Sequence, residues 1–236
     1  MDPVCTGAQP HGLDQLVYVP AGPTRLTGCL SIPIGARGIV LFAHGSGSSR
    51  QSVRNRFVAG ELQSAGLATL LFDLLTPEEG ILDEKSRQFR FDIGLLASRL
   101  SVAAAWIARI PATRSLRVGY FGASTGASAA LTAAALHPER VRAVVSRGGR
   151  PDLAECPLES VCVPTLLIVG GCDHPVIEIN QEALTHLREP KELVIVSRAT
   201  HLFEEAGALE EVAKVAKAWF LRYLPPDAET IIPRAR

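Results

Sequence analysis

The stretch Gly122-Ala123-Ser124-Thr125-Gly126 has the residue types and spacing most able to carry out chemistry. It follows a short apolar run, Val118 to Phe121, and precedes an alanine-rich run that ends at His137-Pro138. These runs predict a buried strand followed by a helix that proline stops. A serine flanked by glycines on such a turn is typical of a nucleophile elbow, where the glycines let neighbouring backbone pass close by. The pattern therefore predicts a nucleophilic Ser124, although G-x-S-x-G also occurs by chance.

A nucleophilic serine needs a base that takes its proton and an acid that orients the base. Asp173 follows a predicted strand, two strands after the elbow, and His201 follows the last predicted strand. The carboxyl ends of parallel strands meet at one edge of a sheet, so these residues would lie near Ser124. The chain order serine, aspartate, histidine is that of the α/β-hydrolases. Asp73, which also ends a predicted strand, is the rival for the acid.

Two backbone N–H groups are expected to hold the charge that develops on the substrate oxygen. Thr125 follows the nucleophile at the start of its helix, where the helix dipole also favours negative charge. Ser46 follows His44-Gly45 in the loop after the first parallel strand. We expect these two residues to form the oxyanion hole. The Gly-Ser run 45–49 is a weak match to a phosphate cradle, because it lacks the final glycine of a dinucleotide fingerprint and the lysine of a P-loop.

Continuous apolar runs alternate with amphipathic runs, which predicts an α/β fold with a mostly parallel central sheet and helices on both faces. Two opening strands would add an antiparallel edge. Charged residues with Pro77 and Gly80 indicate a loop over 76–92, with or without a short helical turn, beside Ser124. The connection 148–163 is too short for a cap domain. The expected strands are 16–19, 25–32, 37–43, 67–72, 118–121, 141–146, 164–169 and 192–197, and the other expected helices are 53–65, 92 onward, 176–187 and 209–223.

Composition excludes several classes of protein. The 236 residues show no break in composition, so we expect one domain over 1–236, with loosely ordered ends at 1–12 and 225–236. Lys plus Arg equals Asp plus Glu, at 24 each, which leaves no net field for nucleic acid. The run 118–136 is uncharged, but its small residues suit a tightly packed helix better than a membrane span. The sequence starts without a basic and apolar leader, which favours the cytoplasm.

The five cysteines are scattered and form no C-x-x-C pair, which favours reduced thiols. Cys172-Asp173-His174 places three metal-ligating types together, but adjacent side chains point in different directions. We expect no metal site and no cofactor.

The sequence resembles the α/β-hydrolase fold and, within it, the small dienelactone-hydrolase-like proteins, from the first strands to the last helix. The resemblance is carried by His44-Gly45, the elbow 122–126, Gly171-Cys172-Asp173 and Thr200-His201. It implies a Ser124-His201-Asp173 triad with an oxyanion hole. Dienelactone hydrolases proper have cysteine as the nucleophile, so dienelactone is not carried over as substrate. Some relatives are hydrolase domains attached to phosphoribosyltransferases, which leaves a non-catabolic role open.

We therefore expect a carboxylic ester hydrolase that cleaves a small ester, thioester or lactone through an acyl-enzyme. Acyl transfer, amide hydrolysis and perhydrolysis would use the same residues, and a non-catalytic binding or regulatory module on this fold is the alternative. Arginines near the sheet edge could hold a carboxylate or phosphate of a small-molecule substrate, although surface arginines often pair with local acids. The sequence indicates no oligomeric state. The candidate arginines are Arg50, Arg90, Arg147 and Arg150.

Overall fold

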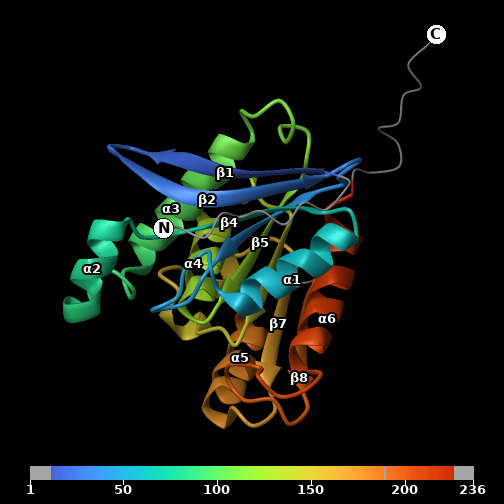
Figure 1. The fold of residues 1–236 in the computed structure, drawn as a ribbon. Helices are drawn as coiled ribbons and strands as arrows, with labels where there is room; N and C mark the ends of the chain where they lie inside the picture. The colour runs from blue at the N-terminus through green and yellow to red at the C-terminus, as the bar shows by residue number, and fades with distance from the viewer. Residues whose placement is uncertain (1–11, 189, 226–236) are drawn as a thin grey trace.

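An eight-stranded sheet forms the centre of the molecule, with helices on both faces (Figure 1). The structure is a computed structural model that describes residues 12–188 and 190–225. The strand order is β1-β2-β4-β3-β5-β6-β7-β8. All neighbouring strands from β4 to β8 pair in parallel, whereas β1 and β2 are antiparallel. The predicted α/β class and mostly parallel sheet are confirmed.

The opening hairpin consists of β1 (Gly12–Ala21) and β2 (Thr24–Pro33). Both strands are longer than predicted, because the pairing continues to the turn, where Ala21 faces Thr24. Gly22 takes a positive φ of 65° there, which glycine adopts without steric cost. Through β2, the hairpin joins β4 and becomes the antiparallel edge that the sequence predicts.

The parallel strands near the centre of the sheet are short and buried along their whole length. Both faces of these strands are covered, which explains why they read as continuous apolar runs rather than alternating ones. The outer strand β8 is only partly buried. The parallel strands are β3 (Ile39–Ala43), β4 (Ala68–Phe72), β5 (Val118–Ala123), β6 (Ala143–Arg147), β7 (Thr165–Gly170) and β8 (Lys191–Val196).

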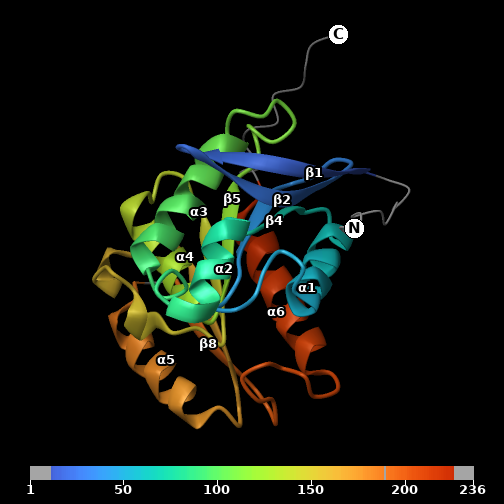
Figure 2. The same cartoon turned by 60° about the vertical axis from the view of Figure 1, so that its left-hand side comes forward.

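Two hydrophobic cores lie on opposite faces of the sheet, as Figures 1 and 2 show. One core packs against α3 (Ile93–Ile107), α4 (Thr125–Leu136) and α5 (His174–His186). The other core packs against α1 (Val53–Ser64) and α6 (Ala208–Tyr223). Because the strands between these two layers of helices run in parallel, every βα turn, and therefore every candidate site residue, lies at the carboxyl edge of the sheet.

The segment 76–92, predicted as a loop with or without a short helical turn, contains a ten-residue helix, α2 (Pro77–Ser86), which is longer than the predicted turn. Thr76 caps its first turn in a reciprocal capping box with Glu79. Proline is tolerated in a first helical turn, because its missing N–H would have no helical partner there. The guanidinium of Arg99 on α3 also holds both Glu79 oxygens, each at 2.6 Å. The helix projects beside α3 (Figure 2).

The connection between β6 and β7 contains only two short 3-10 turns, Pro151–Leu153 and Leu158–Ser160. No cap domain is inserted there, as predicted. Of the predicted loose ends, 1–11 and 226–236 lie outside the described residues, while Gly12 begins β1. Among the helices of the described part of the chain, none is long and apolar enough to cross a membrane.

Candidate active site

Ser124 lies on a sharp turn between β5 and α4, with φ 50° and ψ −120°. This left-handed conformation is unusual for a residue other than glycine and is the strained backbone that the elbow motif predicts. The flanking glycines are needed because their neighbours approach closely. A Cβ at Gly122 would lie 2.4 Å from the Ala127 Cα, and one at Gly126 would lie 2.1 Å from the Ala43 carbonyl oxygen.

His201 and Asp173 meet at the same edge of the sheet. The His201 Nδ1 lies 2.7 Å from the Asp173 Oδ2, from the loop after β8 and the turn after β7 respectively. Since a carboxylate only accepts, Nδ1 is the donor in this bond, which leaves Nε2 as the ring nitrogen that can take a proton. Among residues 12–188 and 190–225, no hydrogen bond joins Ser124 to this ring.

The end of β6 contacts both the elbow and the loop that carries His201, residues 197–207, which we call the histidine loop. The Ser124 N–H donates to the Arg147 carbonyl at 3.1 Å. At the next residue, a Cβ on Gly148 would lie 3.4 Å from Cε1 and 3.5 Å from Nδ1 of His201. Gly148 has a φ of 53° and lets the imidazole pack directly on the strand end. One short segment thus contacts both the elbow and the histidine.

Asp73, the rival acid, is engaged elsewhere. Its Oδ1 accepts the Arg50 backbone N–H at 2.7 Å, and its Oδ2 pairs with the Arg50 guanidinium. These bonds fix the loop after β3 to the end of β4. Asp73 therefore holds a loop, whereas Asp173 is the carboxylate that contacts His201.

Ser46 and Thr125 lie side by side, with their hydroxyl oxygens 3.0 Å apart. Thr125 is the first residue of α4, so its N–H has no acceptor within the helix. The Ser46 loop also passes close to the nucleophile, since a Cβ on Gly45 would lie 3.1 Å from the Ser124 Cβ. This geometry brings the two residues of the predicted oxyanion hole to the elbow.

His44 is the first residue of the loop that carries Ser46, residues 44–52, which we call the oxyanion loop. It is 8% exposed, and its Nε2 accepts the Leu74 N–H at 3.0 Å. Nδ1 must then carry the hydrogen and donate to the Gly45 carbonyl, also at 3.0 Å. Burial lowers the pKa of His44, which favours the neutral ring that this pair of bonds requires. His44 thus links the oxyanion loop to the end of β4 and shapes the loop.

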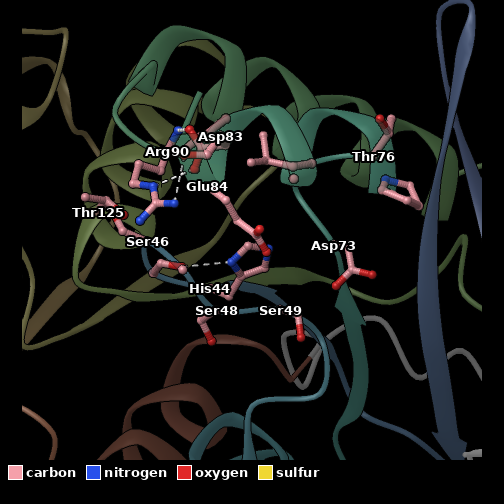
Figure 3. A pocket seen from close by; sticks show the side chains of 16 residues that line it. His44, Ser46, Ser48, Ser49, Asp73, Thr76, Asp83, Glu84, Arg90 and Thr125 are labelled. Atoms are coloured by element: carbon pink, nitrogen blue, oxygen red, sulfur yellow. Dashed lines mark hydrogen bonds and ion pairs between the residues drawn. The ribbon is translucent and has the colours of Figure 1, made fainter. Parts of the chain in front are cut away.

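A hollow of about 320 Å³ lies beside Ser46 and Thr125, between the loop after β3 and α2 (Figure 3). Residues of the 76–92 segment, which the sequence places beside Ser124, line it, whereas residues 147–152 at the end of β6 do not. Ser124 and His201 are also absent from its lining, so the hollow adjoins the site on the oxyanion side. Its lining consists of His44, Gly45, Ser46, Gly47, Ser48, Ser49, Asp73, Leu75, Thr76, Pro77, Gly80, Asp83, Glu84, Arg90, Leu96 and Thr125.

The candidate arginines mostly pair with acids close in sequence or space. Arg50 binds Asp73, and Arg150 binds Asp152 through two bonds of 2.8 and 2.7 Å. Neither arginine lines the hollow. Only Arg90 does, held by its Nε to the buried Asp83 at 2.5 Å (Figure 3).

Arg147 does not line the hollow either, and its assignment as a substrate contact stays a prediction. It shares a face of β6 with Val145, which belongs to the core under α1 and α6. Its side chain is buried there, with the guanidinium 5.9 Å from the ring centre of Phe203. The sequence could not show which face of the strand each helix covers.

Sequence reasoning missed two acidic residues of the hollow, Asp83 and Glu84, because both belong to the unpredicted helix α2. The sequence signal for the start of this helix is Thr76-Pro77-Glu78-Glu79, in which a capping threonine is followed three residues later by glutamate. Asp83 accepts the backbone N–H groups of both Phe89 and Arg90, and so organises the turn that follows the helix.

The sheet order, the elbow after β5 and the histidine–aspartate pair at the same edge define an α/β-hydrolase. Est1E from Butyrivibrio proteoclasticus has this fold, with a TM-score of 0.73 at 15% identity, covering 88% of this chain and 98% of its own. The dienelactone hydrolase of Anabaena variabilis ATCC 29413 is 61% identical, with a TM-score of 0.89, over 91% of this chain and 99% of its own. This chain belongs to the dienelactone hydrolase family. No protein-family model matches it.

Curated relatives carry a different name. Two Mycobacterium tuberculosis proteins, from strains CDC 1551 and H37Rv, have the provisional name phosphoribosyl transferase and are each 59% identical over 217 residues. The match covers 92% of this chain but 48% of each relative. The chain thus spans about half the length of these relatives.

Proposed function

We propose that this chain is a serine hydrolase of a small ester, thioester or lactone, with Ser124 as nucleophile, His201 as base and Asp173 as the acid that orients the base. The observation that carries the proposal is the 2.7 Å bond between His201 and Asp173, at the edge where Ser124 has a strained elbow conformation. The identity of 61% to a dienelactone hydrolase over nearly the whole chain supports a hydrolase.

In the proposed reaction, the His201 Nε2 takes the hydroxyl proton while the Ser124 oxygen attacks the substrate carbonyl. The N–H groups of Ser46 and Thr125 hold the oxyanion, and the positive end of the α4 dipole adds to its stabilisation. The protonated imidazole then gives its proton to the leaving alcohol or thiol, and the acyl group stays on Ser124. Water activated by His201 hydrolyses this acyl-enzyme. In a lactone the leaving alcohol remains attached to the acyl group.

Acyl transfer, amide hydrolysis and perhydrolysis would use the same residues and differ only in the acceptor or leaving group. We assign phosphoribosyl transfer in the longer relatives to the part that this chain does not cover. The contrasting hypothesis is a non-catalytic binding module, and the bond that orients His201 argues against it. A module that only binds has no need of an oriented base beside a strained serine.

The proposed acyl-enzyme is tested by rapid mixing of the protein with p-nitrophenyl acetate. We expect a burst of nitrophenol with an amplitude near one per chain, followed by slower steady turnover, because acylation and deacylation are separate steps. A folded protein that releases no nitrophenol above the buffer rate would favour the binding module. Heat-denatured protein is the control for reaction with surface nucleophiles.

We also propose that Arg90 is the arginine available to an anionic group of the substrate, because it alone of the four candidates lines the hollow. Replacing Arg90 with alanine is expected to raise KM for a carboxylated ester by about tenfold, the loss of one charged hydrogen bond, and to leave a neutral analogue unchanged. Arg150→Ala is the matched control, since Arg150 lies outside the hollow. Equal use of both esters, unaltered in the Arg90 variant, would rule out anion recognition.

A further inference from the structure

Arg147 is the most unusual charged residue near the proposed triad. Arg147 is 7% exposed, and its Nε and Nη1 are buried without a hydrogen-bond acceptor among residues 12–188 and 190–225. Burial, together with repulsion from Arg54, lowers the pKa of Arg147 to about 10. The group is therefore still charged at neutral pH. A buried, unpaired cation is costly, and an apolar side chain of similar volume is often neutral or stabilising at such a position. Stability alone does not explain this arginine.

The group that the guanidinium faces is Phe203, two residues after His201. The Phe203 ring centre lies 5.9 Å from the guanidinium carbon, within the range of a cation–π contact. Phe203 is 1% exposed, so the ring serves as the buried anchor of the histidine loop. The Leu202 side chain beside it is 41% exposed and makes no comparable anchor.

The histidine loop has a strained backbone that needs such an anchor. Phe203 has a φ of 55° and Arg198 a φ of 62°, both in the left-handed region that favours glycine. Strained residues of this kind persist only where their surroundings hold them. Within the loop, the Phe203 N–H donates to the Thr200 carbonyl at 3.2 Å, which closes a turn around His201.

Arg147 also contacts the other half of the site through its backbone. Its carbonyl accepts the Ser124 N–H at 3.1 Å, and Gly148 packs against the His201 imidazole. One residue thus fixes the elbow through its main chain and faces the histidine loop through its side chain.

We propose that Arg147 is a positioning residue, whose buried guanidinium holds Phe203 and thereby keeps His201 in register with Asp173 and Ser124. The role in turnover depends on the proposed hydrolase function, whereas the hold on the loop does not. This role accounts for a buried charge at a position where an apolar residue would make the fold more stable. A base displaced by about 1 Å loses on the order of 10²-fold in rate, so the rate kept by anchoring the loop offsets the stability lost by burying the charge.

The test compares Arg147→Met, which keeps most of the volume and removes the charge, with Arg142→Met, an exposed arginine before the same strand. We expect Arg147→Met to lower kcat by about 10- to 100-fold with KM nearly unchanged, and to speed hydrogen–deuterium exchange over 199–206. Its Tm should stay equal or rise, because an unpaired buried charge is removed. Arg142→Met should match the wild type in all three measurements.

Phe203→Leu is the second variant and reports on the other side of the contact. It should give the same kcat loss and faster loop exchange, and the double variant should lose no more than the worse single variant, because both changes break one contact. Leu202→Ala is the control within the loop. Unchanged loop exchange in both single variants, additive losses of kcat, or a kcat loss in Arg147→Met that follows a fall in its own Tm would overturn the proposal. Exchange is measured without substrate, so it still tests the anchor if the wild type shows no turnover.

Discussion

Replacing Ser124 with alanine is expected to lower ester turnover at least about 10³-fold, because the proposed acyl-enzyme forms on the Ser124 hydroxyl. Steady-state hydrolysis of p-nitrophenyl acetate measures the loss. Ser64→Ala is the matched control, since Ser64 is on the exposed surface of α1, where its hydroxyl bonds to the Gly60 carbonyl. A Ser124 variant that keeps turnover within about tenfold of the wild type would show that another nucleophile acts.

The Ser124→Gly variant shows whether the loss of ester turnover is separate from a loss of folding stability. It should be as inactive as the alanine variant, but more stable than the alanine variant by about 1 kcal/mol, because glycine adopts the φ of 50° and ψ of −120° without strain. Urea unfolding measures the difference. A glycine variant less stable than the alanine variant would contradict the strain at the elbow.

Replacing Gly126 with alanine should cost more than about 4 kcal/mol of stability, which for many domains prevents folding. The new Cβ would lie 2.1 Å from the Ala43 carbonyl oxygen and 2.6 Å from the His44 carbonyl oxygen. Both are backbone atoms at the end of β3, so neither can move without separating the oxyanion loop from the elbow. Circular dichroism during urea unfolding measures the effect.

Gly60→Ala is the control for the Gly126 prediction. Gly60 lies within α1, and a Cβ there would meet no atom within 4 Å beyond the backbone of its own helix. Alanine should therefore raise stability by up to about 1 kcal/mol through its better helix propensity. A Gly126→Ala protein that unfolds at the same urea concentration as the wild type would contradict the close packing at the elbow.

The sheet and the elbow could be predicted because their signals are local. Buried strands appear as continuous apolar runs, and the strand-turn-helix pattern around Ser124 spans few residues. The topological positions of Asp173 and His201 then follow from the rule that parallel strands bring their carboxyl ends to one edge. The family resemblance gave the same three residues.

Helix α2 was missed because its stability depends on both local and distant partners. Pro77 and Gly80 suggested a loop, whereas the capping box of Thr76 and Glu79 favours a helix. The Arg99 guanidinium that holds Glu79 comes from α3, twenty residues further along the chain. No periodicity within 76–92 reports that contact.

The arginines show a second limit of sequence reasoning. Each lies at the end of a strand or in a loop near the site, yet their acidic partners and the face of the sheet decide what they contact. Arg50 holds Asp73, Arg150 holds Asp152, and Arg147 lies under Phe203 in the core beneath α1 and α6. Only the three-dimensional packing separates Arg90, at the hollow, from the other three.

Labelling with a fluorophosphonate tests the central claim, a nucleophilic Ser124 activated by His201, most directly. Intact mass spectrometry of the folded wild-type chain should show one adduct, and peptide mapping should locate it on Ser124. The Ser124→Ala protein should show no adduct, and His201→Ala should react far more slowly. A folded wild-type chain that stays unlabelled, or an adduct on another residue that persists in the Ser124 variant, would contradict the account.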